Sequence, residues 1–139
     1  MAEIDSNQIY DGLTFALHRA FPGARIYGGI IEQGLKDGDF NVLPILMGHA
    51  EQAVGRVQNK PTFDIVYYPS IAGGREECLR VAHVLSWELR IIQTPKGDKI
   101  HCSSFETNIE ADALHCIVSY PYFAYMPEMR DPMESLEIE

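Results

Sequence analysis

Two His-Cys dipeptides, His101-Cys102 and His115-Cys116, are the first residues in this chain whose types could do chemistry. Imidazole and thiolate are the usual tetrahedral ligands of zinc, so a metal site is the first chemistry to consider. Both dipeptides fall in segments with strand character, where adjacent side chains point to opposite faces, so each pair can supply only one ligand to a site. We therefore interpret the cysteines as small buried hydrophobic residues and the histidines as groups at the surface or at an interface. No metal and no other cofactor is predicted.

Nucleophilic catalysis is the second chemistry to consider. Cys78 lies on the apolar stripe of a predicted helix, where burial disfavours the reactive thiolate. His18 and His83 lie in two separate predicted helices, and no motif links either of them to a serine or a carboxylate. Glu76 and Glu77 open the second predicted helix, where they meet the positive end of the helix dipole and have a structural role. No catalytic residue is predicted.

Binding of phosphate or nucleic acid is the third possibility. The glycine pairs Gly28-Gly29 and Gly73-Gly74 lack the spacing and the Lys-Ser/Thr of a phosphate-binding loop, so we assign them to backbone geometry. Aromatic residues at 120–125 would stack on bases only beside a basic groove, and the chain carries 20 acidic residues against 11 lysines and arginines. The formal charge of −9 is the wrong sign for gripping a phosphate backbone. These aromatic residues are therefore predicted to make core and subunit contacts.

The spacing of apolar residues predicts two amphipathic helices, over residues 6–20 and 75–92. Asp5 or Ser6 is expected to cap the first helix, and Phe21-Pro22-Gly23 to end it. The core stripe predicted for the second helix consists of Cys78, Val81, Ala82, Leu85, Leu89 and Ile92.

Strand character marks five further segments. An Asp37-Gly38 turn predicts that the first two strands form a hairpin, and residues 48–61 predict a long loop before the third because they show no sustained period. The last two strands are predicted to pair across the acidic connection at 108–112, with even-numbered residues such as Cys102 and Cys116 on the core face. The five strands are predicted at residues 24–32, 40–47, 62–68, 99–107 and 113–125.

This order of elements predicts an α+β fold with about five mainly antiparallel strands in one sheet and both helices packed on it. Residues 1–125 are expected to form one domain, since 139 residues are too few for two independent cores, and residues 126–139 to form a flexible acidic tail. An odd number of cysteines and no signal-peptide pattern favour reduced thiols and a cytosolic origin. No apolar stretch approaches the ~18–20 residues of a membrane span, so no membrane is expected.

Several short motifs occur along the chain in a recognisable order and spacing. They are Arg25-Ile26-Tyr27, Glu32-Gln33-Gly34-Leu35, Phe63-Asp64-Ile65-Val66-Tyr67-Tyr68-Pro69, Glu77-Cys78, Leu114-His115-Cys116 and Met133-Glu134-Ser135-Leu136-Glu137. Taken together, they resemble the tail terminator proteins of long-tailed bacteriophages and prophages of Gram-positive bacteria. Two positions depart from the family pattern, Arg56-Val57 in place of a basic residue followed by an aromatic one, and Gly38 in place of a proline.

The resemblance implies a structural protein without enzymatic activity. Such a protein assembles as a ring, here expected to be a hexamer, on the head-proximal end of the completed tail tube. There it stops tube growth and offers a surface to head-completion proteins. Its partners would be copies of itself, the tail tube protein and a head-completion protein, with DNA passing through without specific binding. The implied location is the virion tail, with assembly in the host cytoplasm.

Contacts in a cyclic ring are heterologous, so one patch of each subunit meets a different patch of the next. The loop at 48–60 and the tail are the two predicted patches. If DNA slides through the ring, acidic walls would repel its phosphates over a Debye length of ~8 Å. The predicted contact residues are Gly55, Arg56, Met133, Leu136 and Ile138, and the predicted acidic lumen consists of Glu106, Glu110 and Asp112, together with the acidic tail.

Three other functions remain open from the sequence. A neighbouring head–tail joining or minor tail protein of similar size would share these features, because fold and function are loosely tied. A small α+β ligand-binding or regulatory module is the second, and a ligand-induced thermal shift in a monomer would favour it. An enzyme that uses Cys102 or Cys116 with a histidine is the third, and loss of turnover in a serine variant would favour that.

Overall fold

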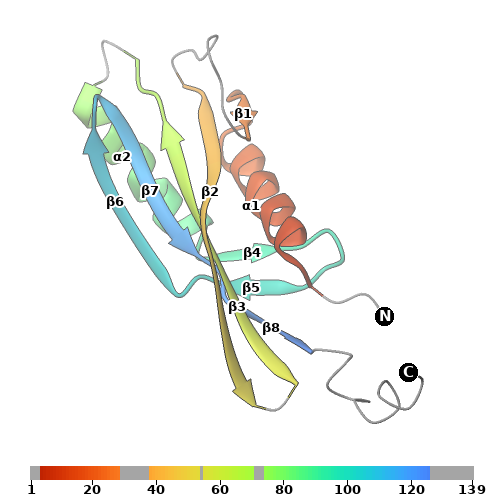
Figure 1. Cartoon of the computed structure of the whole chain (residues 1–139). Helices are drawn as coiled ribbons and strands as arrows, with labels where there is room; N and C mark the ends of the chain where they lie inside the picture. Colours follow the sequence, from red (N-terminus) through yellow and green to blue (C-terminus); the bar gives the residue numbers. More distant parts are fainter. Residues whose placement is uncertain (1–3, 29–37, 54, 71–73, 126–139) are drawn as a thin grey trace, which may run out of the picture.

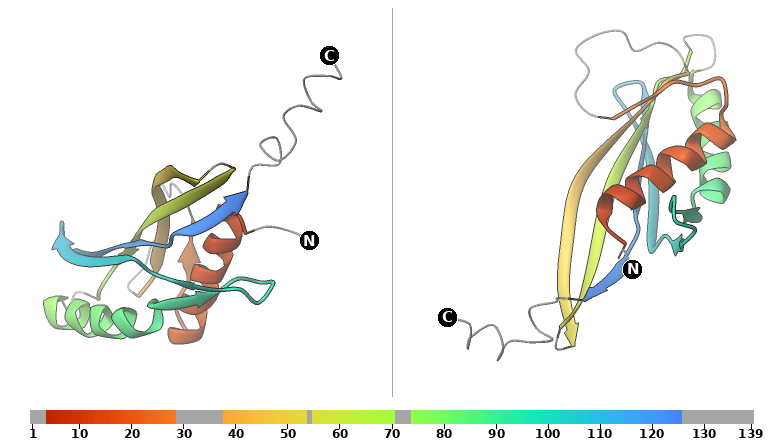
Figure 2. Two further views of the ribbon diagram at one scale, coloured as in Figure 1. Left: turned by 90° about the horizontal axis from the view of Figure 1, so that it is seen from below. Right: turned by 90° about the vertical axis from the view of Figure 1, so that its right-hand side faces the viewer.

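The computed structural model describes residues 4–28, 38–53, 55–70 and 74–125 of the chain. One curved sheet is covered on a single face by two helices and a small two-stranded sheet (Figures 1 and 2). The predicted α+β class, with both helices on one mainly antiparallel sheet, is confirmed. Within the described residues, neither helix is long and apolar enough to cross a membrane.

Helix α1 spans Ser6–Ala20, as the apolar spacing predicted. Asp5 caps its start, because its side chain accepts a hydrogen bond of 2.8 Å from the backbone N–H of Gln8. At the other end the N–H of Phe21 donates to the carbonyl of Leu17, and Pro22 follows. The stripe buried against the sheet consists of Ile9, Gly12, Leu13, Ala16 and Leu17.

Gly12 explains how the small sheet comes to lie against α1. A Cβ atom at this position would stand only 2.7 Å from the backbone oxygen of Gln93. The backbones of α1 and of strand β4 (Ile91–Gln93) therefore approach at a distance that only glycine permits. The helical cost of a glycine, about 1 kcal/mol relative to alanine, is offset by this packing.

Helix α2 spans Gly74–Glu88 and is shorter than predicted. The N–H of Leu89 still bonds to the carbonyl of Leu85, after which the chain turns and enters β4. Ile92 is buried as expected, but it reaches the core from a strand and not from the helix. The prediction failed there because Ile92 falls by chance on the helical spacing. Strand β4 pairs with β5 (Lys99–His101) across the predicted turn at 94–98.

The main sheet has the strand order β1-β2-β3-β7-β6, and β8 pairs with the free part of β3. All of its pairs are antiparallel except β1 with β2. Its strands are β1 (Ile26–Tyr27), β2 (Phe40–Ala53), β3 (Arg56–Tyr67), β6 (Ser104–Glu110), β7 (Ala113–Ser119) and β8 (Tyr122–Tyr125).

The hairpin predicted across Asp37-Gly38 is wrong. Strand β1 runs parallel to β2, with Ile26 opposite Phe40, and a tight turn cannot join parallel strands. Gly38 does adopt a positive φ of 89°, and its N–H donates to the carbonyl of Tyr68 at the end of β3. The glycine therefore serves the junction of β2 and β3. Residues 29–37, which include Asp37 of the predicted turn, lie outside the described residues.

The long loop predicted at 48–61 is also wrong, because these residues extend β2 and β3 into a hairpin. Gly55, with φ 77°, lies at its turn, and β8 pairs with the same part of β3. We call the paired residues 46–53, 55–61 and 122–125 the arm; it projects beyond the helices (Figure 1). Little of the arm is covered by the helices, so it lacks the apolar alternation that marks a strand over a core.

The predicted strand at 99–107 is broken at Cys102-Ser103 into β5 and β6. In the β6–β7 hairpin Thr107 lies opposite Cys116, so odd-numbered residues of β6 share a face with even-numbered residues of β7. The prediction of one even-numbered face across both strands is therefore wrong for β6. The expected burial of both cysteines is nevertheless found, since Cys116 is fully buried and half-buried Cys102 packs against the core. Burial raises the pKa of the Cys116 thiol, in keeping with a small hydrophobic role.

The turn between β6 and β7 offers a test of local strain. Ala111 and Asp112 have φ angles of 52° and 61°, a left-handed pair typical of a two-residue hairpin turn. Because alanine tolerates this region poorly and asparagine tolerates it well, Ala111→Asn should raise the free energy of unfolding by about 0.5–1 kcal/mol. Urea denaturation measures the difference. Thr107→Asn, in the strand of the same hairpin, should bring no gain, and an equal gain there would contradict the explanation.

Candidate assembly surfaces

The histidines and cysteines that could do chemistry do not gather at one site in the described structure. Among the residues that the structure describes, no group of three or more His, Cys, Asp or Glu side chains could hold a metal ion. His101 is exposed on β5, while His115 on β7 lies 3.0 Å from a carboxylate oxygen of Asp64 on β3. The cysteine neighbours of both histidines face the core, as expected of strand residues.

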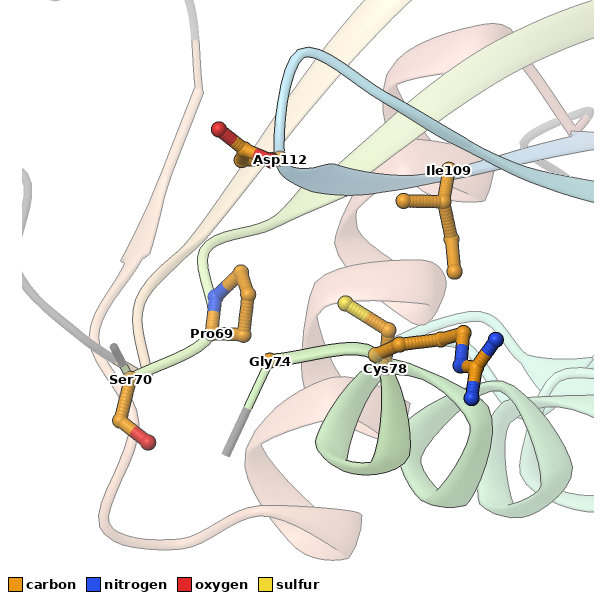
Figure 3. Close-up of a pocket in the computed structure, with 7 residues that line it drawn as sticks. Pro69, Ser70, Gly74, Cys78, Ile109 and Asp112 are labelled. Atoms are coloured by element: carbon orange, nitrogen blue, oxygen red, sulfur yellow. The ribbon is translucent and has the colours of Figure 1, made fainter. Parts of the chain in front are cut away.

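A pocket of about 320 Å³ lies where α2 begins (Figure 3). Figure 3 shows its lining from the end of β3, the start of α2 and the β6–β7 hairpin, with Cys78 and Ile109 from opposite elements. Burial, and secondarily the charge of Glu77, raises the pKa of the Cys78 thiol, so the nucleophilic form is disfavoured. Asp112 lies in this pocket lining, at the hairpin turn.

Glu77 anchors the start of α2 to the end of β3. The Tyr67 hydroxyl donates to one carboxylate oxygen over 2.5 Å, and the Ser70 hydroxyl donates to the other over 2.6 Å. The backbone N–H of Ser70 adds a third bond of 3.2 Å. Hydrogen bonds from Ser70 and then Tyr67 lower the pKa of Glu77, and burial followed by the bond to Glu77 raises the pKa of Tyr67. The carboxylate thus has a structural role, as expected, through side-chain bonds.

The pKa of Glu77 predicts how stability responds to acid. Its folded-state pKa lies below the unfolded value of about 4.3, so the stabilisation is complete above that pH and is lost as pH falls through the folded pKa. Glu77→Gln should lower the free energy of unfolding at pH 7 by about 1–2 kcal/mol and flatten the acid limb below pH ~4. Chemical denaturation at pH values from about 2 to 7, in steps of about half a pH unit, measures both effects. An unchanged acid limb in the variant would contradict this role; Glu76→Gln, exposed in the same turn, is the control.

The face of the sheet opposite the helices, which we call the helix-free face, carries acidic side chains. Glu106 lies opposite Ile117 of β7, which in turn lies opposite Asp64 of β3. Glu110 follows on the same side of β6, because successive side chains alternate along a strand. Two of the three acids predicted for a lumen therefore share one face, and Asp112 lies apart from them in the hairpin turn.

Among the strands that the structure describes, the main sheet has two free edges. Strand β1 pairs with only the first two residues of β2, so along the rest of β2 no described strand pairs with its outer side. Strand β6 is the opposite edge. Next to a register shift in β2, Ile45, Leu46 and Met47 are 50%, 63% and 41% exposed. An edge strand with exposed apolar side chains is a template for pairing with another chain.

The predicted contact residues Gly55 and Arg56 lie together at the turn of the arm. The guanidinium of Arg56 lies 3.8 Å from the ring centroid of Phe123 on β8, a cation–π contact. Its Nε is buried without a hydrogen-bond partner within the described residues. The other predicted contact residues, Met133, Leu136 and Ile138, lie outside the described residues.

A groove runs along α1, and the sequence does not predict it. Two hollows of about 300 and 400 Å³, both lined by Phe15 and Gln93, lie between α1 and the β4–β5 sheet. Phe15 and Ile91 project into water there. Phe15 lies outside the buried stripe of α1, and an apolar residue at such a position is the only sign of this groove in the sequence.

A family model described as "Phage tail terminator protein" matches residues 8–132. The matched segment begins within α1 and runs past β8, so it covers both helices and every strand described. No curated protein matches the chain.

Proposed function

Because the chain belongs to the phage tail terminator family, whose members are structural proteins of the virion tail, we propose that it caps the head-proximal end of a tail tube as a ring. The ring, a hexamer in this proposal, stops tube growth and offers the surface to which a head-completion protein binds. Copies would be made in the host cytoplasm, from a phage or prophage genome, and would join the tube protein there. This role requires no catalysis by the chain.

The observation that carries the proposal is a sheet with two different free edges. A cyclic ring needs heterologous contacts, and the β2 edge of one copy meeting the β6 edge of the next would supply them. Backbone hydrogen bonds would then continue the sheet around the ring, with Ile45, Leu46 and Met47 buried at each junction.

The position of the helices favours one orientation of the copies in such a ring. Both helices and the β4–β5 sheet lie on one face of the main sheet, so that face is the bulkier one (Figure 2). In a ring the outer circumference has more room than the inner one. The helix-free face, with Asp64, Glu106 and Glu110, would then face the axis, where its negative charge repels passing DNA.

Electron microscopy of tail tubes incubated with the purified protein tests the proposal. The natural chain should form rings on one end of each tube, and tails assembled with it should have a uniform length. The double variant Ile45→Lys, Leu46→Lys should lose the rings and give tubes of irregular length, because two charges would enter the junction.

Leu79→Lys is the matched control, since Leu79 is 58% exposed on helix α2 and so does not lie on either edge strand. It should cap tubes normally. Normal capping by the edge variant would argue against pairing through β2, and bare tube ends with the natural chain would argue against the function itself.

A further inference from the structure

The groove along α1 has the character of a binding surface. Its two hollows share Phe15 and Gln93, so they lie next to each other along the helix. Phe15 is 62% exposed and Ile91 is 40% exposed, so two large apolar side chains line it in contact with water. Exposed apolar groups gathered in a depression favour the binding of another segment of chain.

Charged side chains stand at the two ends of the groove. Arg19 and Lys99 line the hollow that holds Ile91, and Asp11 lines the other one. Arg19 lies 3.6 Å from Glu88, but this ion pair is exposed and weak, so Arg19 remains available to a second carboxylate. A segment that suits the groove has apolar side chains, with acidic groups toward the Arg19 end.

We infer that the C-terminal segment of a second copy, residues 126–139, binds this groove; the inference rests on the proposed function in that the ring supplies the second copy. The segment interleaves apolar and acidic residues and holds one cation near its start. From residue 133 onward the apolar residues are Met133, Leu136 and Ile138 and the acids that flank them are Glu134, Glu137 and Glu139, and the one cation of the segment is Arg130.

The charges also fix the direction of the segment. With Arg130 toward Asp11, the acids Glu134 and Glu137 lie toward Arg19 and Lys99. The segment then runs parallel to α1. From Asp11 to Arg19 the helix rises about 12 Å, which about four residues of extended chain cover.

The path of β8 favours a second copy over the same chain. The side chains of Ser6 and Tyr122 are in hydrogen-bond contact at 3.2 Å, so β8 starts beside the start of α1. It then runs to Tyr125, opposite Arg56 at the turn of the arm, away from the helix layer (Figures 1 and 2). The chain therefore leaves the domain pointing away from its own groove. The eight residues from there to Met133 span at most about 29 Å, so in this direction the segment can extend beyond its own domain.

Site-specific photo-crosslinking of the full-length chain on tail tubes tests the inference. A benzophenone amino acid replaces Phe15, and the protein is a mixture of ¹⁵N-labelled and unlabelled copies. Mass spectrometry should find crosslinks to residues 126–139 that join a labelled copy to an unlabelled one. Leu136→Asp should lower their yield about tenfold, the effect of losing one buried leucine contact. The same photoreactive group at Leu79 should give no such crosslinks, because Leu79 is exposed outside the groove.

A charge swap adds a rescue experiment. Glu134→Lys with Glu137→Lys should lower the yield several-fold, and adding Arg19→Glu with Lys99→Glu should restore it. Crosslinks only within a copy, or none to residues 126–139, would overturn the inference. If rings still capped the tubes in that case, the proposed function would stand alone; crosslinks between copies without capped tubes would sustain the inference and refute the function.

Discussion

Tyr120→Ala should lower the free energy of unfolding by about 4 kcal/mol, a large share of the ~5–15 kcal/mol that stabilises a domain of this kind. Tyr120 is the largest side chain that is fully buried in the described core. Its hydroxyl donates a 2.6 Å hydrogen bond to the carbonyl of Leu89, just after α2 ends. Its backbone N–H donates to the carbonyl of Pro61 in β3. One residue therefore holds together the β7–β8 junction, the central strand and the end of a helix.

Two further variants separate the parts of this effect. Tyr120→Phe keeps the ring and removes the hydroxyl, so it should cost only about 1–3 kcal/mol, the cost of an unsatisfied buried carbonyl. Leu79→Ala, at an exposed position of α2, should change stability by less than about 0.5 kcal/mol. Urea denaturation followed by circular dichroism measures all three. If Tyr120→Ala costs no more than Tyr120→Phe, the ring does not carry the packing assigned to it.

The sequence predicted well the elements whose burial is one-sided. Helix α1 has the predicted bounds because its stripe faces the core and its ends carry Asp5 and Pro22 as local signals. The core face of β7 was predicted for the same reason, since Leu114, Cys116 and Val118 are buried and the residues between them are less buried. A regular period appears where one face is buried and the other is not.

The sequence could not predict the elements that depend on distant partners. The sequence predicts a loop where the arm lies, because few residues of the arm pack on the core and residues 48–61 therefore show no apolar period. The parallel pairing of β1 depends on its contacts with β2. The break at Cys102-Ser103 depends on a hydrogen bond from the N–H of Cys102 to the carbonyl of Arg90, in another part of the chain. The α1 groove was missed because it forms only when β4 packs against Gly12.

The contact surfaces of the chain also fall into those that the sequence predicts and those that it does not. The sequence predicts Gly55 and Arg56 as contact residues of a loop, and in the structure they lie at the turn of the paired arm. The sequence does not predict a contact surface at Ile45, Leu46 and Met47, although they form the most exposed apolar run on the described surface. Its residue types look like those of a core strand, so only the pairing pattern reveals that the strand is an edge.

Reversing the charge of the helix-free face should block genome delivery while tail assembly continues. The double variant Glu106→Lys, Glu110→Lys reverses two charges in every copy, on strand positions exposed to solvent. In the proposed ring these lysines would line the axis and bind phosphates of the passing DNA. Infectious titre per assembled particle should fall on the order of tenfold or more, and the purified variant should retain DNA on a filter at low salt but release it at high salt.

Charge-neutral and displaced substitutions separate this effect from folding. Glu106→Gln with Glu110→Gln removes the repulsion without adding attraction, so its titre should fall far less. Glu76→Lys places one lysine on the exposed surface of α2, on the opposite side of the sheet, and should leave the titre unchanged. Because both strand positions are exposed, the lysine variant should keep the unfolding free energy within about 0.5 kcal/mol of the natural chain. A normal titre from the lysine variant would mean that these acids lie away from the path of the DNA, and the formal charge of −9 would then serve solubility alone.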